Sequence, residues 1–263
     1  MGLRRFFPET FTIGAQLFLH LPLALSLRPS GQEEKQKIIP QLFLETSQGQ
    51  CEIAGSFNED VPFRPAPALR YVHMFNDQGD EVTGLEKAKH VLVALPSKVY
   101  ASVELLEMVN RAAGSLPAGT RIFVRHHPDC GMDQIIKSFG AGRWPAYFEW
   151  SMGSLPEVLK EVAVMVAFPS NIVIEASIKG LPVVFVYGQT LLDQNPLRDF
   201  KLEWVEDCYS SLEVSQALGR LLHVTQKERI MFREKGRNLR EYFFTPVNEQ
   251  NMRIFIEDQP TRK

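Results

Sequence analysis

The sequence predicts an α/β protein built around a doubly wound parallel sheet. Residues 163–187 carry the clearest signal, because two apolar segments flank a polar break and a short helical segment that ends at Gly180. That order of parts is typical of a parallel β-α-β unit. Apolar segments of strand length alternate with helical ones from residue 90, and the pattern beyond Arg198 is mostly helical. This alternation favours a parallel sheet with helices on both faces.

The elements of this sheet can be placed one by one. Strands are predicted at residues 90–95, 121–126, 147–150, 163–168 and 182–187. Helices are predicted at residues 99–113, 132–139, 155–162, 171–180, 212–222, 227–242 and 247–256. Right-handed crossovers place every strand-to-helix loop at one edge of such a sheet. These loops are therefore expected to share one ligand-binding crevice.

The first part of the chain is harder to place. Residues 38–45 predict a strand, and the polar, turn-rich residues 46–60 predict a short helix. Three prolines in residues 61–73 predict a stiff, extended connector between domains. We therefore expect four parts: a domain remnant, the connector, a nucleotide-binding domain, and a terminal helix with its tail. Their expected limits are residues 1–60, 61–73, 74–245 and 246–263.

Composition excludes some classes of protein. The net charge of −2 and the isoelectric point near 6.3 argue against a nucleic-acid-binding protein, which needs a basic excess. The three cysteines, Cys51, Cys130 and Cys208, are far apart and include no CxxC pair. This spacing predicts neither a disulfide framework nor a zinc site, and it fits a reducing cytoplasm.

An apolar, leucine-rich segment follows Arg4 and Arg5 near the amino terminus. Leucines alternate with other residues from Leu17 to Leu27, which is a strand-like period, although Pro22 would disrupt a central strand. The segment is too short and too interrupted to span a bilayer. It also lacks the small-residue cleavage site of a signal peptide. We expect a packed domain remnant or a contact with a membrane surface, and a solvated loop or helix start at residues 31–37.

The polar break before residue 171 predicts an anion-binding site. Ser170 and Asn171 lie where a strand ends and a helix begins, and unpaired amides at a helix start can bind phosphate. Glu175 follows Asn171 at i+4, on the same helix face. An anion site beside a carboxylate suits a nucleotide, with the acid on the ribose hydroxyls. Ser170 and Asn171 can equally serve as N-caps alone, and Glu175 can be a solvated helix residue.

A basic cluster, Arg125-His126-His127-Pro128-Asp129, ends the strand at residues 121–126. The predicted topology opens it into the same crevice as Ser170. Imidazole and guanidinium groups there could contact a diphosphate or assist a leaving group. Alternatively, the two histidines are ordinary strand-end residues. A metal site is disfavoured, because adjacent side chains on a strand point to opposite faces and no further ligand lies at the right spacing.

These motifs together resemble the carboxyl-terminal, donor-binding half of a GT-B glycosyltransferase. The resemblance rests on R-H-H-P after one strand, S-N-I-V-I-E-A-S-I-K-G-L-P-V-V after a later one, and a helical end, and it covers about residues 66–255. The spacing from Glu175 to Gly180 is similar to that in the lipid II N-acetylglucosaminyltransferase. His127-Pro128 with a later serine-headed helix is similar to bacterial capsule, polysialic acid and teichoic acid transferases.

The resemblance implies a Rossmann-like domain and a role for each motif residue. His127 would act on the phosphate or leaving group, and Glu175 would hold the ribose. Ser170 and Asn171 would hold the phosphate, and by a looser likeness Gln189, Asp193 and Gln194 would touch the donor sugar. Arg125 and His126 are added as candidate substrate-binding residues from the basic cluster itself. The implied activity is metal-independent sugar transfer from a nucleotide-sugar in surface polysaccharide biosynthesis, with no cofactor.

A complete GT-B enzyme also has an acceptor-binding domain of Rossmann size. About sixty residues precede the connector here, too few for such a domain. We therefore expect either a truncated chain or a second subunit that supplies the acceptor domain, with a peripheral membrane contact as a further option. Two alternative functions stay open: a sugar-nucleotide epimerase, and a non-enzymatic nucleotide-binding scaffold.

Overall fold

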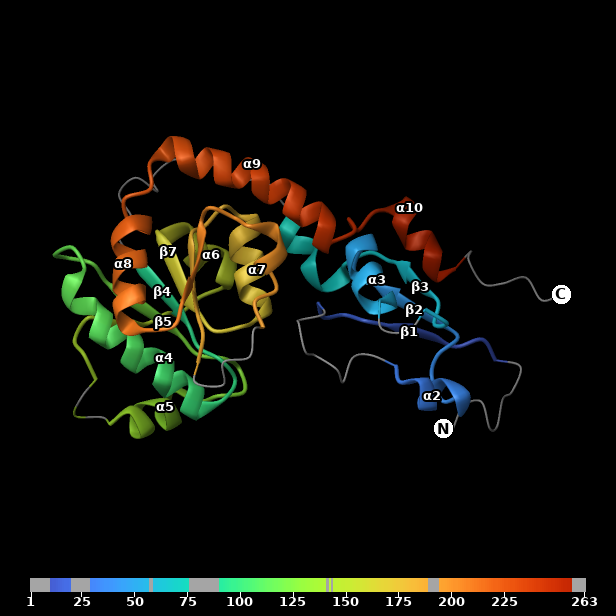
Figure 1. Ribbon diagram of the computed structural model, residues 1–263, viewed down its shortest axis with the longest axis horizontal. Coiled ribbons are helices and arrows are strands. Elements are labelled where there is room, and N and C mark those ends of the chain that lie inside the picture. The colour runs from blue at the N-terminus through green and yellow to red at the C-terminus, as the bar shows by residue number, and fades with distance from the viewer. Residues whose placement is uncertain are drawn as a thin grey trace. The chain divides into compact units, whose positions relative to one another are not determined.

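The computed structural model describes residues 10–19, 29–56, 59–75, 90–140, 142, 144–188 and 194–256 (Figure 1). The chain forms two compact units. Unit 1 contains Met1–Gly79 and Asn238–Lys263, and unit 2 contains Asp80–Arg237. The second boundary falls within helix α9 (Gln226–Phe243). These limits differ from the sequence-based ones, which set the connector at residues 61–73 and the end of the main domain at residue 245.

Unit 2 contains a six-stranded, wholly parallel sheet with the order β6-β5-β4-β7-β8-β9. Numbered from β4, this order is 3-2-1-4-5-6, the order of a Rossmann fold. The predicted α/β, Rossmann-like sheet is therefore confirmed. The strands are β4 (Val91–Ala94), β5 (Ile122–Arg125), β6 (Phe148–Trp150), β7 (Val164–Ala167), β8 (Val183–Val186) and β9 (Val205–Cys208).

Helices cover both faces of this sheet (Figure 1). On one face, α4 packs against α5 and α8, and on the other α7 packs against α9. The predicted elements between residues 90 and 187 are all present, with ends that differ by one or two residues. The helices are α4 (Val99–Ala112), α5 (Met132–Phe139), α6 (Leu155–Glu161), α7 (Asn171–Ile178) and α8 (Ser211–Leu221), with 3-10 turns at Ala113–Ser115 and Arg198–Phe200.

One strand of this sheet was not predicted from the sequence. The chain beyond Arg198 is mostly helical, as expected, but Val205–Cys208 form β9, which pairs with β8. The two acidic residues of β9 hide the apolar pattern of a strand. Glu206 forms an ion pair with Arg220 of α8, and Asp207 accepts a 2.8 Å hydrogen bond from Asn195 Nδ2. An edge strand with one paired side tolerates such polar residues.

Two glycines allow α9 to pack closely on α7. Gly180 follows α7 with a φ of 70°, and a Cβ atom there would lie 2.6 Å from the Arg233 nitrogen of α9. A Cβ atom on Gly236 would overlap the Ile178 carbonyl of α7. Arg229 of α9 is buried and donates a 3.3 Å hydrogen bond to the Ala163 carbonyl. Burial lowers the pKa of this guanidinium. Gly180 therefore ends a helix, as expected, and also admits the backbone of α9.

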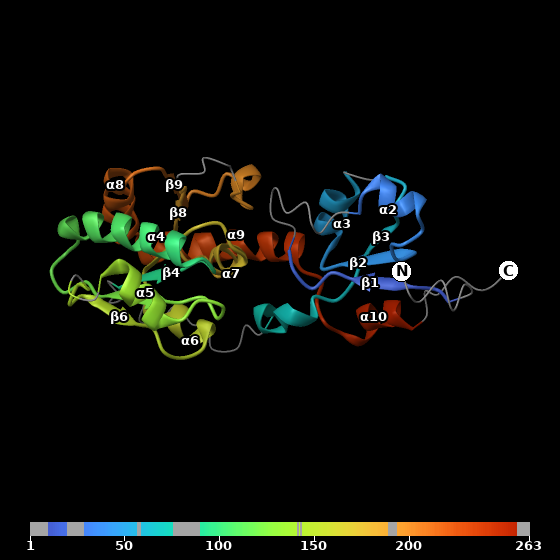
Figure 2. The ribbon, with the colours of Figure 1, turned by 90° about the horizontal axis from the view of Figure 1, so that it is seen from below.

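Unit 1 is built on a small parallel sheet with the order β1-β2-β3. Figure 2 shows α3 on one side of this sheet and α10 on the other. Leu42 and Leu44 of β2 pack with Ile254 and Phe255, from the end of the chain. The elements are β1 (Ile13–Ala15), α2 (Gly31–Lys35), β2 (Leu42–Glu45), α3 (Gln48–Gly55), β3 (Phe63–Pro65), a 3-10 segment (Leu69–Phe75), α10 (Glu249–Met252) and a 3-10 turn (Arg253–Phe255).

Several expectations for this unit need correction. Residues 61–73 are not simply an extended connector, because Phe63–Pro65 pair with β2 as a third strand. The predicted strand at 38–45 is shorter, since Pro40 cannot donate to a ladder. The leucine-rich segment contributes no strand at residues 17–19, and its residues 20–27 lie outside the described ranges. Among the described residues, no helix is both long and apolar enough to cross a membrane.

Candidate functional site

Three loops of unit 2 begin at the same level of the sheet. Ala94, the last residue of β4, is in register with Arg125 of β5 and with Ala167 of β7. Because neighbouring strands lie about 4.8 Å apart, the ends of β5 and β7 are roughly 10 Å apart. The strand order reverses between β4 and β7, which is where ligands bind in sheets of this type. The sheet therefore brings the histidine cluster and the start of α7 to one edge.

Arg125 holds a neighbouring loop in place. Its Nη1 atom donates a 2.9 Å hydrogen bond to the carbonyl of Gly153, in the loop between β6 and α6. Gly153 has a φ of 111°, a conformation that L side chains rarely adopt. The structure thus gives Arg125 a positioning role at the edge of the crevice, and its predicted contact with substrate stays a prediction.

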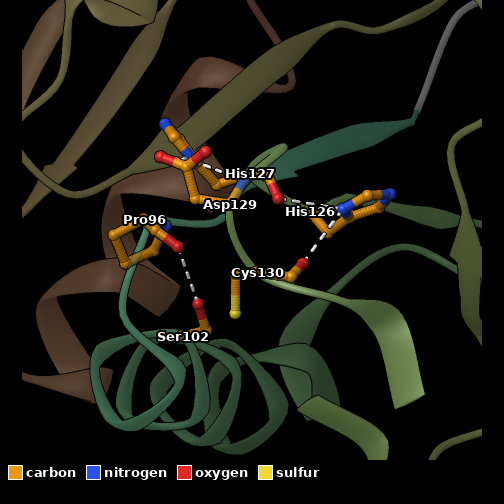
Figure 3. A network of polar contacts seen from close by, with 6 residues as sticks. All are labelled: Pro96, Ser102, His126, His127, Asp129 and Cys130. Atoms are coloured by element: carbon orange, nitrogen blue, oxygen red, sulfur yellow. Dashed lines mark hydrogen bonds and ion pairs between the residues drawn. The ribbon is translucent and has the colours of Figure 1, made fainter. Parts of the chain in front are cut away.

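His126 closes the turn that follows β5 (Figure 3). Its Nδ1 atom lies 3.0 Å from the His127 carbonyl and 3.1 Å from the Cys130 carbonyl. Both partners are acceptors, so Nδ1 carries the proton and Nε2 is the acceptor. The ring also lies edge-on to Trp150 of β6, with centroids 6.1 Å apart. These contacts fit the structural alternative for His126 better than a substrate contact.

His127 has the opposite tautomer. Its Nδ1 atom accepts a 3.1 Å hydrogen bond from the Asp129 amide, so the neutral ring carries its proton on Nε2. The Asp129 carboxylate lies 3.5 Å from the same Nδ1 atom, and the His127 side chain is 39% exposed. Protonation of the ring would turn Nδ1 into a donor facing this carboxylate. The ring can therefore present an Nε2 proton to solvent in either charge state.

Ser170 begins α7 without capping it. The residue is extended, with φ −166° and ψ 163°, but its hydroxyl makes no capping hydrogen bond. Ser47 and Ser210, by contrast, cap their helices through the hydroxyl oxygen. The first turn of α7 contains no acidic residue. The helix start can therefore receive an anion from outside, with the Ser170 hydroxyl beside it.

The remaining predicted site residues are placed less completely. Asn171 is the first residue of α7, and Glu175 is partly buried one turn further along the same helix. Gln194 is described and partly exposed, whereas Gln189 and Asp193 lie outside the described residues. Gln194 precedes Asn195, which is buried and bonded to Asp207 of β9 and to the Leu197 amide. Asn195 thus anchors the end of this loop to the sheet.

Sequence reasoning missed the loop after β4. Ser97 and Lys98 lie between the histidine cluster and the start of α7 in the strand order, at the point where that order reverses. Lys98 is exposed and precedes α4 without a side-chain cap. Figure 3 shows the neighbouring Pro96, whose carbonyl accepts a 3.0 Å hydrogen bond from the Ser102 hydroxyl. The sequence signal that could have identified this loop is a small residue, Ser97, and a basic residue, Lys98, between an apolar strand and a helix.

The described residues offer no grouping of three or more His, Cys, Asp or Glu side chains that could hold a metal ion. Cys130 follows the histidine cluster but is buried, and Figure 3 shows its side chain directed toward α4. Cys51 and Cys208 are also buried, and burial raises the pKa of each thiol to about 12. The side chains at this edge supply imidazole, guanidinium, hydroxyl, ammonium and carboxylate groups beside the backbone amides.

Comparisons with known proteins identify the fold. No family model matches the sequence, and no curated protein matches it. The structure is similar to the wall teichoic acid polymerase TagF, with a TM-score of 0.51, 13% identity, and coverage of 86% of this chain and 60% of that one. It is also similar to Anabaena Alr3699/HepE in complex with UDP-glucose, with a TM-score of 0.51, 11% identity, and coverage of 78% and 60%.

A third similar structure is the N-terminal domain of Candida albicans trehalose-6-phosphate phosphatase. Its TM-score is 0.54 at 13% identity, with coverage of 97% of this chain and 65% of that one. The chain thus spans less than two thirds of each of these structures. At such low identities the likeness concerns the fold alone. The protein has a GT-B-type α/β fold with a Rossmann-like unit and a smaller, three-stranded parallel unit.

Proposed function

We propose that this chain is a glycosyltransferase, or the donor-binding half of one, and that it binds a nucleotide-sugar at the carboxyl edge of the six-stranded sheet. One observation carries the proposal. The α7 start, with the uncapped Ser170 hydroxyl, follows β7, and the exposed His127 imidazole, with its Nε2 proton, follows β5. The ends of these two strands are level and lie on either side of β4, where the strand order reverses. Both features favour a phosphate group between them.

In this proposal each residue has a defined task. The amides of the α7 start, with Ser170 and Asn171, hold the phosphates, and Glu175 accepts hydrogen bonds from the ribose hydroxyls. In its protonated form, with Nδ1–H facing the Asp129 carboxylate, His127 donates its Nε2 proton to the departing phosphate oxygen and is left neutral, so that the leaving group carries less charge in the transition state. Lys98 adds a positive charge at the same edge. Gln189, Asp193 and Gln194 are proposed to contact the donor sugar, and no metal is needed for charge stabilisation.

The solved structures support the reaction class by their descriptions. TagF is described as a teichoic acid polymerase, and HepE is described in complex with UDP-glucose. By extension from these similar folds, we propose that the present chain acts in the biosynthesis of a surface polysaccharide. An epimerase and a non-enzymatic nucleotide-binding scaffold are the competing outcomes. Neither has an observation of its own in the structure.

A thermal-shift screen of UDP-, CMP-, GDP- and CDP-linked sugars tests the proposal. At least one donor should raise the melting temperature, because a ligand that binds only the native state stabilises it. Glu175→Ala should then weaken binding of that donor by roughly 1–3 kcal/mol, since the ribose hydroxyls lose their acceptor. Glu234→Gln, at an exposed position of α9, is the matched control.

The outcomes separate the three functions. Stabilisation by a donor followed by sugar transfer or donor hydrolysis supports a transferase, and an isomerised donor identifies an epimerase. Binding with no turnover in the presence of any acceptor supports the scaffold. If no donor in the panel binds, the proposal is wrong.

A further inference from the structure

A groove of about 550 Å³ lies beside α4 and α8, separate from the loops after β5 and β7. It is lined by one face of α4 from Tyr100 to Arg111, by the residues that follow β8, and by the start of α8. The residues that follow β8 and β9 lie at the carboxyl ends of those strands. The lining includes Tyr100, Tyr187, Tyr209, Glu104, Glu107 and Gly188.

Aromatic rings form part of the lining of this groove. Tyr187 and Tyr209 stack with centroids 4.5 Å apart and an interplanar angle of 9°. Tyr187 is 6% exposed and Tyr209 is 57% exposed, so the buried ring supports the exposed one. The Tyr209 amide donates a 2.6 Å hydrogen bond to Glu213 of α8, which fixes its backbone. Tyr100 of α4 is 72% exposed. The groove thus presents rigid aromatic surface to solvent.

Carboxylates supply the polar part of the lining. Glu104 lies close to Gly188, since a Cβ atom on this glycine would be 3.5 Å from both carboxylate oxygens. The Oε2 atom of Glu107 lies 3.9 Å from Nη2 of Arg111, which also lines the groove. Two carboxylates and one guanidinium leave the lining with a net negative charge. This formal charge favours a neutral ligand over an anionic one.

We propose that this groove is a binding site for a neutral saccharide. A pyranose ring has an apolar face of C–H groups that packs on an aromatic ring, and hydroxyls at its rim that donate to carboxylates. Tyr209 and Tyr100 supply the first kind of surface, and Glu104 and Glu107 supply acceptors. The charge of the lining distinguishes this site from the phosphate-binding edge. The proposal does not depend on transfer activity.

Saturation-transfer NMR on the full chain tests this site with maltotriose, cellotriose and chitotriose as probes. Glucose 6-phosphate and choline serve as the anionic and cationic comparisons. At least one neutral saccharide should receive saturation, and Tyr209→Ala should weaken its binding by up to about tenfold, as expected for a lost aromatic contact. Glu104→Gln should weaken it too. Leu212→Ala, an exposed α8 residue that does not line the groove, should leave it unchanged.

Tyr100→Ala keeps the test independent of folding, because this ring is mostly exposed. It should reduce saccharide binding without lowering the melting temperature. The proposal is overturned if none of the three saccharides receives saturation, or if the tyrosine variants bind as the wild type does. Preferential binding of choline or of glucose 6-phosphate would also overturn it.

Discussion

The two histidines that follow β5 are adjacent in the sequence but make different hydrogen bonds. His126 donates from Nδ1 to two backbone carbonyls, whereas His127 accepts at Nδ1 from an amide. The first arrangement uses the imidazole to close a turn. The second leaves an Nε2 proton available at the edge of the sheet. Only His127 therefore combines exposure with the tautomer that a proton donor needs.

Substitution of each histidine should separate these roles. His127→Ala should lower turnover of the nucleotide-sugar by about 10²–10⁴-fold and leave stability nearly unchanged, because a general acid is lost. His126→Ala should instead lower the free energy of unfolding by about 1–3 kcal/mol, because the partly buried His127 and Cys130 carbonyls lose a donor. Steady-state kinetics and urea denaturation of both variants check this. Loss of folding in the His127 variant, with no separate effect on turnover, would favour a structural role.

His90 gives the native state a defined pH dependence. Burial, followed by the positive charge of Arg121, lowers the pKa of His90 below its ordinary 6.5, while Glu149 and Glu161 act in the opposite direction. Its Nδ1 accepts a 3.4 Å hydrogen bond from the Arg121 amide. The native state thus binds the proton more weakly than the unfolded state. Stability contributed by neutral His90 is present above the ordinary pKa and is lost as the pH falls through it.

The urea concentration at the midpoint of unfolding should therefore decrease as the pH is lowered from about 7.5 to about 5.5. The decrease should be smaller in His90→Gln. Denaturation of both proteins at each pH measures this. An equal fall in the two proteins would show that His90 does not carry the effect.

The carboxyl end of α9 is held by side chains from the turn after β2. The last carbonyls of a helix have no partner within it. Thr46 Oγ1 donates to the Phe243 carbonyl at 3.0 Å, and Ser47 Oγ donates to the Tyr242 carbonyl at 2.5 Å. The Ser47 oxygen also accepts from the Gln50 amide and so caps α3. The buried polar residues Thr46 and Ser47 of unit 1 therefore connect the turn after β2 to the carboxyl end of α9.

Removing the Ser47 hydroxyl should destabilise unit 1 in particular. Ser47→Ala loses a helix cap and removes a donor from the Tyr242 carbonyl, so the cost should be about 1–3 kcal/mol. Hydrogen exchange should speed up in β2 and α3 more than in β4 or β7. Ser56→Ala, which removes an exposed hydroxyl from the end of α3, is the control and should cost less. Uniform loss of protection in both units would contradict this account.

The sequence predicted the β-α-β alternation well because each strand there is a short apolar segment bounded by turns. It failed for β9, whose acidic residues face partners on other elements, and for β3, whose prolines masked a strand. Ser97 and Lys98 were missed because strand order arises from long-range pairing, which no local pattern records. The difference between His126 and His127 depends on backbone carbonyls that are positioned only after folding.

Unit 1 exposes apolar side chains on two segments that meet where Arg70 lies over the Phe18 ring, 4.3 Å from its centroid. Leu17 and Phe18 are 46% and 45% exposed, and Leu69 and Val72 are 43% and 42% exposed. Exposed groups of this kind mark contacts with partners or membranes.

We therefore predict that the isolated chain self-associates, binds a membrane surface, or needs a second polypeptide for transfer. Light scattering and liposome flotation of the purified protein measure the first two, and Phe18→Ser with Leu69→Ser should reduce either. The matched control is Leu212→Ser, an exposed leucine of unit 2. A monomer that ignores lipid and transfers sugar unaided would contradict the prediction.

The central claim is that a nucleotide-sugar binds at the carboxyl edge of the sheet, between the loops after β5, β4 and β7. Methyl NMR of the full chain, titrated with UDP-, CMP-, GDP- and CDP-linked sugars, tests it most directly. We predict that one donor shifts the methyl signals of Ala94 and Ala167, at the carboxyl ends of β4 and β7, and leaves those of Val91 and Val164, at the amino ends of the same strands, unchanged. Shifts confined to Val91 and Val164 or to unit 1, or no shift with any donor, would contradict it.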